Sequence, residues 1–154
     1  MAFQSVLGTL SRMDVAFRIA SAPDDQLKSF MVRCLVFCGE QGIPYAIERD
    51  EFEASAVHVL GEIGGEPVAA GRLRCLPEYA KLERIAVREA YRGRGIGSAL
   101  TDFLVCLARE RGYSSYRMNA QAHLEAFYSR LGFRAVGEKF MEADIEHLLM
   151  VRDD

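Results

Sequence analysis

One stretch of the chain decides its fold and reads Val87-Arg88-Glu89-Ala90-Tyr91-Arg92-Gly93-Arg94-Gly95-Ile96-Gly97-Ser98-Ala99-Leu100. An apolar segment at residues 82–87, which predicts a strand, leads into this loop of three glycines and three arginines. An amphipathic helix is expected directly afterwards, at residues 97–111. Glycines let backbone N–H groups approach a ligand, and the first turn of a helix carries unpaired N–H groups with partial positive charge. This order of elements indicates a site for phosphate groups.

The pattern around this stretch predicts one α/β (α+β) domain. In chain order we expect a strand at 15–20, a helix at 21–38, a loop or short helix at 41–53, strands at 56–63, 66–76 and 80–87, the helix at 97–111, a strand at 115–120, a helix at 122–131 and strands at 133–137 and 146–151. Residues 1–14 are weakly patterned and are interpreted as an N-terminal extension, so the predicted domain spans 15–154.

Composition narrows the class of protein. Half of the 154 residues are apolar, which is ordinary for a soluble domain, and the net charge of −3 argues against a general nucleic-acid-binding protein. No apolar run reaches membrane-spanning length, and no signal peptide is recognisable. The cysteines form no Cys-x-x-Cys pair, and no histidine lies at metal-ligand spacing. We therefore expect buried, reduced cysteines, no metal, no membrane partner and a cytoplasmic location.

Two common glycine-rich motifs do not fit the loop. A Walker loop ends in Gly-Lys-Ser/Thr, which is absent here. A Rossmann fingerprint that starts at Gly93 needs a third glycine where Ser98 stands. The preceding strand also follows an antiparallel hairpin, with its turn at Gly64-Gly65, rather than opening a βαβ unit.

A third motif does fit. The run Arg92-Gly93-Arg94-Gly95-Ile96-Gly97 matches R-x-x-G-x-G and resembles the pyrophosphate loop of the GNAT N-acetyltransferases. Residues 126–133, in which Tyr128 precedes Gly132-Phe133, resemble a second diagnostic segment of that family. Residues 40–44, 56–60 and 119–124 resemble its ElaA/YjcF-like bacterial branch. The resemblance implies a single GNAT domain with a mixed, mostly antiparallel sheet of six to seven strands and about four helices.

The resemblance also implies acetyl-CoA as co-substrate. Its pyrophosphate would bind N–H groups of residues 92–98, with Arg92 and Arg94 adding charge-assisted contacts. Its pantetheine arm would pair with the backbone of residues 85–87, through a divergence between the strands that end at Val87 and Ala120. The implied cofactor-binding residues are Ile85, Ala86, Val87, Arg92, Gly93, Arg94, Gly95, Ile96, Gly97, Ser98, Asn119 and Tyr128.

The implied chemistry is direct attack of an amine on the thioester carbonyl. Tyr128 is the family-implied general acid, because a phenol with an ordinary pKa of roughly 10 keeps its proton at neutral pH. The residues themselves offer two candidate bases: Glu83, expected to share a strand face with Ile85, and His58 on the neighbouring hairpin strand. For both, and for His123 at a helix start, a structural role is an open alternative, as is deprotonation through a chain of waters.

The acceptor is not decided by the sequence. A small-molecule amine is expected, and acetylation of a protein lysine or N-terminus is the variant. A catalytically idle acyl-CoA-binding or sensor domain is the alternative from another class. By family geometry, residues 41–53 flank the acceptor site, and the acidic run at 48–53 either attracts a cationic amine or is a solvated helix face. Homodimers through the last strands are common in the family.

Overall fold

A mixed sheet forms the centre of the computed structural model, which describes residues 15–154. Its strands are β1 (Ala16–Ile19), β2 (Val57–Ile63), β3 (Glu66–Cys75), β4 (Ala80–Val87), β5 (Ser115–Gln121), β6 (Arg134–Glu142) and β7 (Ile145–Asp153). They lie in the order β1-β2-β3-β4-β5-β7-β6, and only β4 and β5 are parallel neighbours. The predicted α+β fold is confirmed, whereas the extension expected at residues 1–14 lies outside the described residues.

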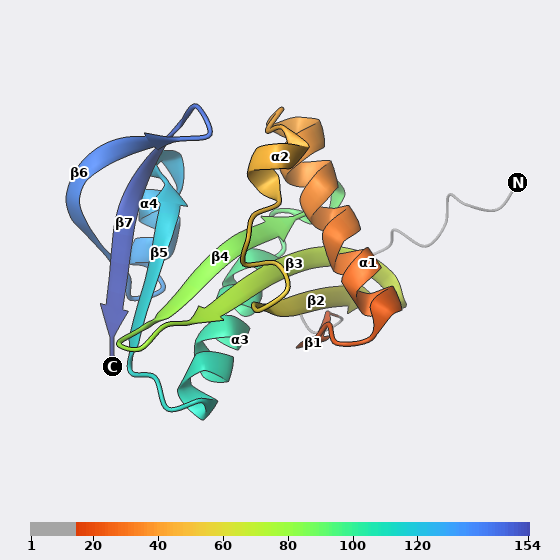
Figure 1. Cartoon of the computed structure of the whole chain (residues 1–154), viewed down its shortest axis with the longest axis horizontal. Coiled ribbons are helices and arrows are strands. Elements are labelled where there is room, and N and C mark those ends of the chain that lie inside the picture. The colour runs from red at the N-terminus through yellow and green to blue at the C-terminus, as the bar shows by residue number, and fades with distance from the viewer. Residues whose placement is uncertain (1–14) are drawn as a thin grey trace, which may run out of the picture.

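Helices cover both faces of the sheet (Figure 1). On one face α1 (Pro23–Arg33) continues as a π-helical segment (Cys34–Glu40) and is followed by α2 (Tyr45–Glu48). On the other face α3 (Ile96–Glu110) packs against β3 and β4. The helix expected at 122–131 is instead a 3₁₀ turn (Ala122–Leu124) followed by the short α4 (Glu125–Ser129), which contacts β6.

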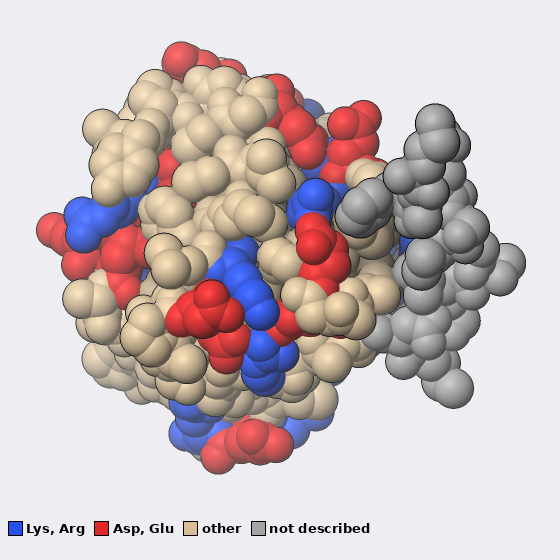
Figure 2. Space-filling model, turned by 90° about the vertical axis from the view of Figure 1, so that its right-hand side faces the viewer, with Lys and Arg blue, Asp and Glu red and all other residues tan. Residues whose placement is uncertain are grey.

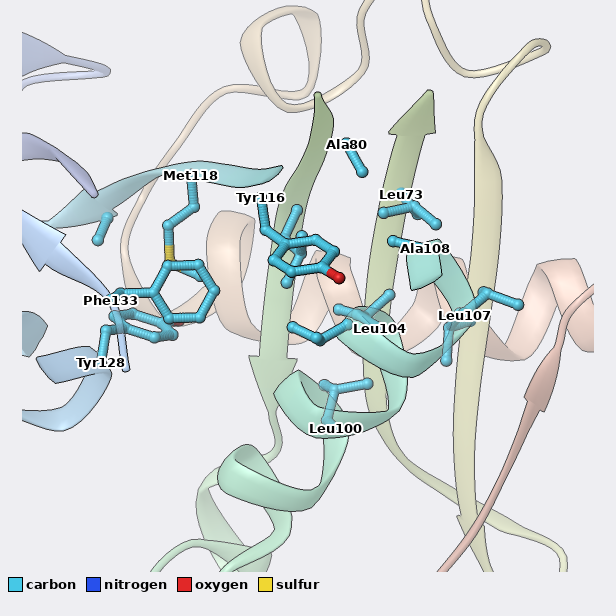
Figure 3. Packing of buried hydrophobic residues seen from close by; sticks show 14 of the residues in the cluster. Leu73, Ala80, Leu100, Leu104, Leu107, Ala108, Tyr116, Met118, Tyr128 and Phe133 are labelled. Carbon is cyan, nitrogen blue, oxygen red and sulfur yellow. The ribbon is translucent and has the colours of Figure 1, made fainter. Parts of the chain in front are cut away.

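The larger core cluster lies between α3 and the sheet (Figure 3). Leu100, Leu104 and Leu107 recur at three- and four-residue spacing, so one side of α3 buries them against the strands. Gly71 in β3 makes this close approach possible, because a Cβ at that position would lie 2.9 Å from a methyl carbon of Leu104. A smaller cluster under α1 contains Val32, Val36, Ala70 and Ala86.

A bulge in β4 reverses the orientation of the strand's side chains. Arg84 has a left-handed φ of 53°, and the β3–β4 register shifts opposite it. Leu82 and Ile85 consequently both pack against the α3 cluster, although they are three positions apart. Glu83 faces the α1 side, where it pairs with Arg72. The expectation that Glu83 and Ile85 share a face is therefore wrong, because regular alternation does not persist through a bulge.

The last two strands are longer than predicted. Gly137, with φ of 79°, was expected to end a strand, but the register shift beside it shows a bulge within β6. The turn between β6 and β7 uses Ala143 and Asp144, with φ values of 51° and 59°. Two-residue hairpin turns with both φ values positive usually contain glycine or asparagine, so this one has no recognisable sequence signal.

The described surface carries charges of both signs, and two of the cysteines are exposed. Lys and Arg side chains lie next to Asp and Glu on the face seen in Figure 2, whose described part has no large area of one charge sign. Cys75 and Cys106 are exposed, so the expectation that all four cysteines are buried is wrong. Within residues 15–154, no helix combines the length and the apolar character needed to cross a membrane.

Candidate active site

A cavity of about 610 Å³ lies where β4 and β5 diverge. The two strands pair only at Ala80 with Tyr116 and at Lys81 with Arg117, so the divergence expected from the sequence is present. Backbone edges that no strand occupies line the gap beyond these pairs. The lining comes from the π-helical segment and α2, from β4 and β5, from the glycine loop and α3, from α4, and from the β6–β7 turn.

The glycine loop gives one wall of the cavity its anion-binding character. Gly93 and Gly95 have φ values of 76° and 79°, a conformation that side chains disfavour. The Ala99 N–H donates to the Gly95 carbonyl oxygen over 3.1 Å, so the N–H groups of residues 96–98 precede the first bond of α3. Gly97 has a packing role as well, because a Cβ there would lie 3.3 Å from the ring of Phe127.

The two arginines of the motif lie differently. Arg92 lines the cavity, donates from Nε to the Val87 carbonyl oxygen over 2.9 Å and pairs with Glu40 at 2.6 Å. The guanidinium carbon of Arg94 instead lies 5.7 Å from the centre of the Tyr91 ring, and Arg94 is not among the lining residues. The other predicted cofactor-binding residues, Ile85, Ala86, Val87, Gly93, Gly95, Ile96, Gly97, Ser98, Asn119 and Tyr128, all line the cavity.

Tyr128 is buried at the inner wall of the cavity. Its ring makes edge contacts with Phe127 and Phe133, with centroid distances of 4.9 and 6.3 Å. Figure 3 shows Tyr128 beside Phe133. Burial raises the pKa of Tyr128 to about 12. Within residues 15–154 its hydroxyl has no hydrogen-bond partner, so its proton is free for a ligand in the cavity.

The two predicted bases have different surroundings. Glu83 lines the cavity and pairs with Arg72, with Arg74 at 3.1 Å and with Lys81 at 3.3 Å. Burial opposes its ionisation, but these cations outweigh burial and hold the pKa of Glu83 below its usual range. Glu83 is therefore a weaker base than a free glutamate. His58 is not among the lining residues, and its Nε2 atom lies 2.8 Å from the Glu53 carbonyl oxygen.

A buried ion network adjoins the cavity on the α1 side. Glu48 is only 2% exposed and accepts from Arg33 Nε at 2.6 Å, while Glu53 pairs with Arg33 at 2.8 Å. Arg72, which is also buried, binds Asp50 at 2.7 Å and Glu53 at 2.5 Å. Most of the acidic run at 48–53 is thus not a solvated face: Glu51 is exposed, but Glu48, Asp50 and Glu53 neutralise buried arginines that the sequence pattern did not connect with them.

Three further polar residues of the lining were not among the predicted site residues. Gln41 and Gln121 exchange amide hydrogen bonds of 3.0 and 2.8 Å between the π-helical segment and the end of β5. His147 lies in β7, is 7% exposed and also lines the cavity. Gln41 and Gln121 stand in segments that resemble the ElaA/YjcF-like branch but had no predicted role, and His147 stands in no motif and is brought beside Gln121 only by the pairing of β7 with β5.

Comparison with known proteins identifies the family to which this chain is similar. The family model described as an acetyltransferase (GNAT) domain matches residues 36–153. The uncharacterized N-acetyltransferase YjcF of Bacillus subtilis is 40% identical over 84% of this chain and 94% of YjcF. The crystal structure of Escherichia coli ElaA superposes with a TM-score of 0.80 and 28% identity, over 90% of this chain and 99% of ElaA.

A more distant structure shares the fold alone. It is a GNAT family acetyltransferase from Elizabethkingia anophelis with acetyl-CoA bound, with a TM-score of 0.68 and 17% identity over 91% of this chain and 98% of that one. The fold and the sequence matches together define an acetyltransferase class. The chain belongs to the GNAT acetyltransferase family, as its sequence motifs predicted, and the matches to YjcF and ElaA agree with the predicted branch.

Proposed function

We propose that this protein transfers an acetyl group from acetyl-CoA to a primary amine. The observation that carries the proposal is a single cavity that joins the N-terminus of α3 to Tyr128 along the unpaired edges of β4 and β5. Such a cavity suits a donor with a phosphate group at one end, an arm that forms backbone hydrogen bonds, and a reactive thioester. Acetyl-CoA bound to the Elizabethkingia relative supports this donor class.

The proposed chemistry is direct attack of the amine nitrogen on the thioester carbonyl. The backbone N–H of Val87, at the cavity wall, is the proposed donor to the developing oxyanion. Tyr128 is the proposed general acid: its raised pKa keeps the phenol protonated at neutral pH, ready to donate to the departing sulfur. Of the two bases suggested by the sequence, Glu83 lines the cavity but is weakened by its three cations, and His58 lies outside the lining.

The same observations bear on the acceptor of the acetyl group and on the cellular compartment of the protein. A small-molecule amine is the proposed acceptor, because the hydrogen-bonded Gln41–Gln121 pair and α2 line the cavity on the α1 side, where the acceptor is expected. We place the protein in the cytoplasm, the reducing compartment in which its four free cysteines persist.

The test measures acetyl-CoA turnover with four acceptors: 2-phenylethylamine, spermidine, glucosamine and a peptide that has a free N-terminus and a lysine. Products are separated by chromatography, because exposed Cys75 and Cys106 would react with thiol reagents. Tyr128→Phe is expected to lower kcat roughly 100-fold, the usual effect of losing a general acid. The matched control is Tyr116→Phe, since the Tyr116 hydroxyl binds the Tyr113 carbonyl oxygen and Asp154, outside the cavity lining.

Binding of acetyl-CoA is measured separately by calorimetry. If the protein binds acetyl-CoA and acetylates only the peptide, its acceptor is a protein and not a small amine. Tight binding without turnover of any acceptor would favour a sensor domain, and absence of binding would exclude both readings.

A further inference from the structure

We propose that His147 is the catalytic base, and that its Nε2 atom takes a proton from the acceptor ammonium. This inference rests on the proposed N-acetyltransferase activity and supplies the proton acceptor which that activity lacks. His147 is buried in β7 and lines the cavity. An imidazole is the side chain best suited to accept and release a proton near neutral pH.

Hydrogen bonding fixes which ring nitrogen can accept the proton. Nδ1 of His147 lies 2.7 Å from the carbonyl oxygen of Ile145. A carbonyl oxygen can only accept, so Nδ1 carries the hydrogen and Nε2 of the neutral ring keeps its lone pair. The ring also stacks on Phe140, with centroids 6.0 Å apart and planes 24° apart, which fixes its orientation. Within residues 15–154 no donor hydrogen-bonds to Nε2, so the lone pair is available to a ligand.

The sheet places His147 on the side of the cavity where the acceptor is expected. His147 is the cross-strand partner of Gln121, and cross-strand partners point to the same face of a sheet. The Gln121 amide reaches Gln41 at the end of the π-helical segment, so this face is the one that carries α1 and α2. Tyr128 packs in the cluster on the α3 face instead. Base and acid therefore reach the cavity from opposite faces of the sheet, so the two proton transfers can take place on different sides of the thioester.

Charged side chains surround His147. Glu142 of β6 faces the ring, with its Oε2 atom 3.7 Å from Nε2. His123 after β5 and Glu48 of α2 line the same cavity, as do Lys81 and Arg84 on the β4 wall. Of the carboxylates, Glu83 is tied to three cations, so the imidazole is the better proton acceptor.

The proposed step balances without a further reactant. Nε2 takes one proton from the ammonium, and the freed lone pair forms the N–C bond to the acetyl carbonyl carbon. The C–S bond then breaks, Tyr128 gives its proton to the sulfur, and the second proton of the nitrogen restores the phenol. The products are the amide, the CoA thiol and one proton on His147, which passes to solvent.

Two substitutions separate a base from a structural histidine. His147→Asn keeps an N–H where Nδ1 donates to Ile145 and removes Nε2, whereas His147→Gln keeps a polar group near Nε2 and loses that bond. If His147 is the base, both variants lower kcat/KM for the most rapidly acetylated amine of the panel by roughly 100-fold at neutral pH. Near wild-type activity in the Asn variant would overturn the proposal, because it would show that only the bond to Ile145 matters.

The pH profile gives a second readout. Without the base, the reaction depends on amine that is already neutral, so the deficit of the Asn variant should shrink toward the amine's own pKa, roughly 10 for an alkyl amine. A deficit that is equal at every pH would contradict a base role. The Kd of acetyl-CoA, measured by calorimetry, should differ by less than about twofold between the Asn variant and the wild type. If the wild-type protein acetylates none of the amines, the proposed function fails, rather than the assignment of His147.

The wild-type protein offers a test that does not depend on a variant's folding. Nitrogen NMR of the imidazole, with acetyl-CoA bound, should show the tautomer that is protonated at Nδ1. A neutral ring protonated at Nε2 would have no lone pair toward the cavity and would overturn the assignment.

Discussion

Arg92 and Glu40 join two walls of the cavity: Nη2 of Arg92 lies 2.6 Å from Oε2 of Glu40, while its Nε atom donates to the carbonyl oxygen of Val87 over 2.9 Å. Glu40 ends the π-helical segment and Val87 ends β4. The guanidinium is thus held beside the N-terminus of α3 before any ligand binds. Its side chain is 44% exposed, so the pair contributes little to stability and its removal should affect ligand binding far more than folding.

Arg92→Ala should therefore raise the KM for acetyl-CoA roughly tenfold, because it removes one charge-assisted contact worth about 1.5 kcal/mol. The value of kcat should change by less than about threefold. Steady-state kinetics with acetyl-CoA varied at saturating amine measures both constants. Arg134→Ala is the matched control, because Arg134 forms an exposed pair with Asp153 outside the cavity lining. A fall in kcat with an unchanged KM would show that the glycine loop does not bind the donor.

Local features of the site could be predicted because the chemistry lies in contiguous sequence. The glycine loop and the start of α3 occupy adjacent positions, and Tyr128 precedes a recognisable Gly132-Phe133 pair. Apart from β6, which runs on to Glu142 beyond its predicted end at Gly137, the predicted strands and α3 agree with the structure to within a few residues, since hydrophobic periodicity is a local property.

Features that depend on long-range pairing could not be predicted. The bulge at Arg84 puts a non-glycine residue in the left-handed region, and only the register with β3 reveals it. His147 reaches the cavity because β7 inserts between β5 and β6, an order that a linear pattern does not display. Likewise, Arg33 and Glu48 look like surface residues in the sequence and become buried only when α1 and α2 pack together.

Arg72 holds the buried ion network together, so its loss should be costly. Arg72→Met is expected to lower the free energy of unfolding by about 3–5 kcal/mol, because it removes the buried guanidinium that pairs with Asp50, Glu53 and Glu83 at once and leaves each carboxylate with fewer cations. Denaturant unfolding measures the loss. Arg134→Met, at an exposed ion pair, should change stability by less than about 0.5 kcal/mol. A similar small change for Arg72→Met would mean that solvent reaches these carboxylates.

Ala143 in the β6–β7 turn is a site where glycine should stabilise the fold. Its φ of 51° lies in the left-handed region, which costs a residue with a Cβ about 1–2 kcal/mol. Glycine relieves this strain but loses more entropy on folding, so Ala143→Gly should add a net amount of about 0.5–1 kcal/mol. Thermal unfolding tests this, with Ala135→Gly within β6 as a control that should destabilise the protein. Destabilisation by both substitutions would contradict the turn geometry.

Tyr128 should also make the stability of the protein fall in alkali. Burial raises its pKa from the ordinary value of 10.0 to about 12, so between these values the folded protein keeps a proton that the unfolded chain releases. The stabilisation is fully present below pH 10 and is lost as the pH rises through about 12; two pKa units correspond to about 3 kcal/mol.

The variant Tyr128→Phe tests this, because it has no phenol proton to lose. The difference in free energy of unfolding between this variant and the wild type, measured in urea, should therefore shift steadily in favour of the variant between about pH 9 and 12. Tyr45→Phe, at a ring that is 60% exposed, should instead follow the wild-type pH dependence. Parallel curves for wild type and Tyr128→Phe would show that water reaches the phenol, and would remove the reason for its high pKa.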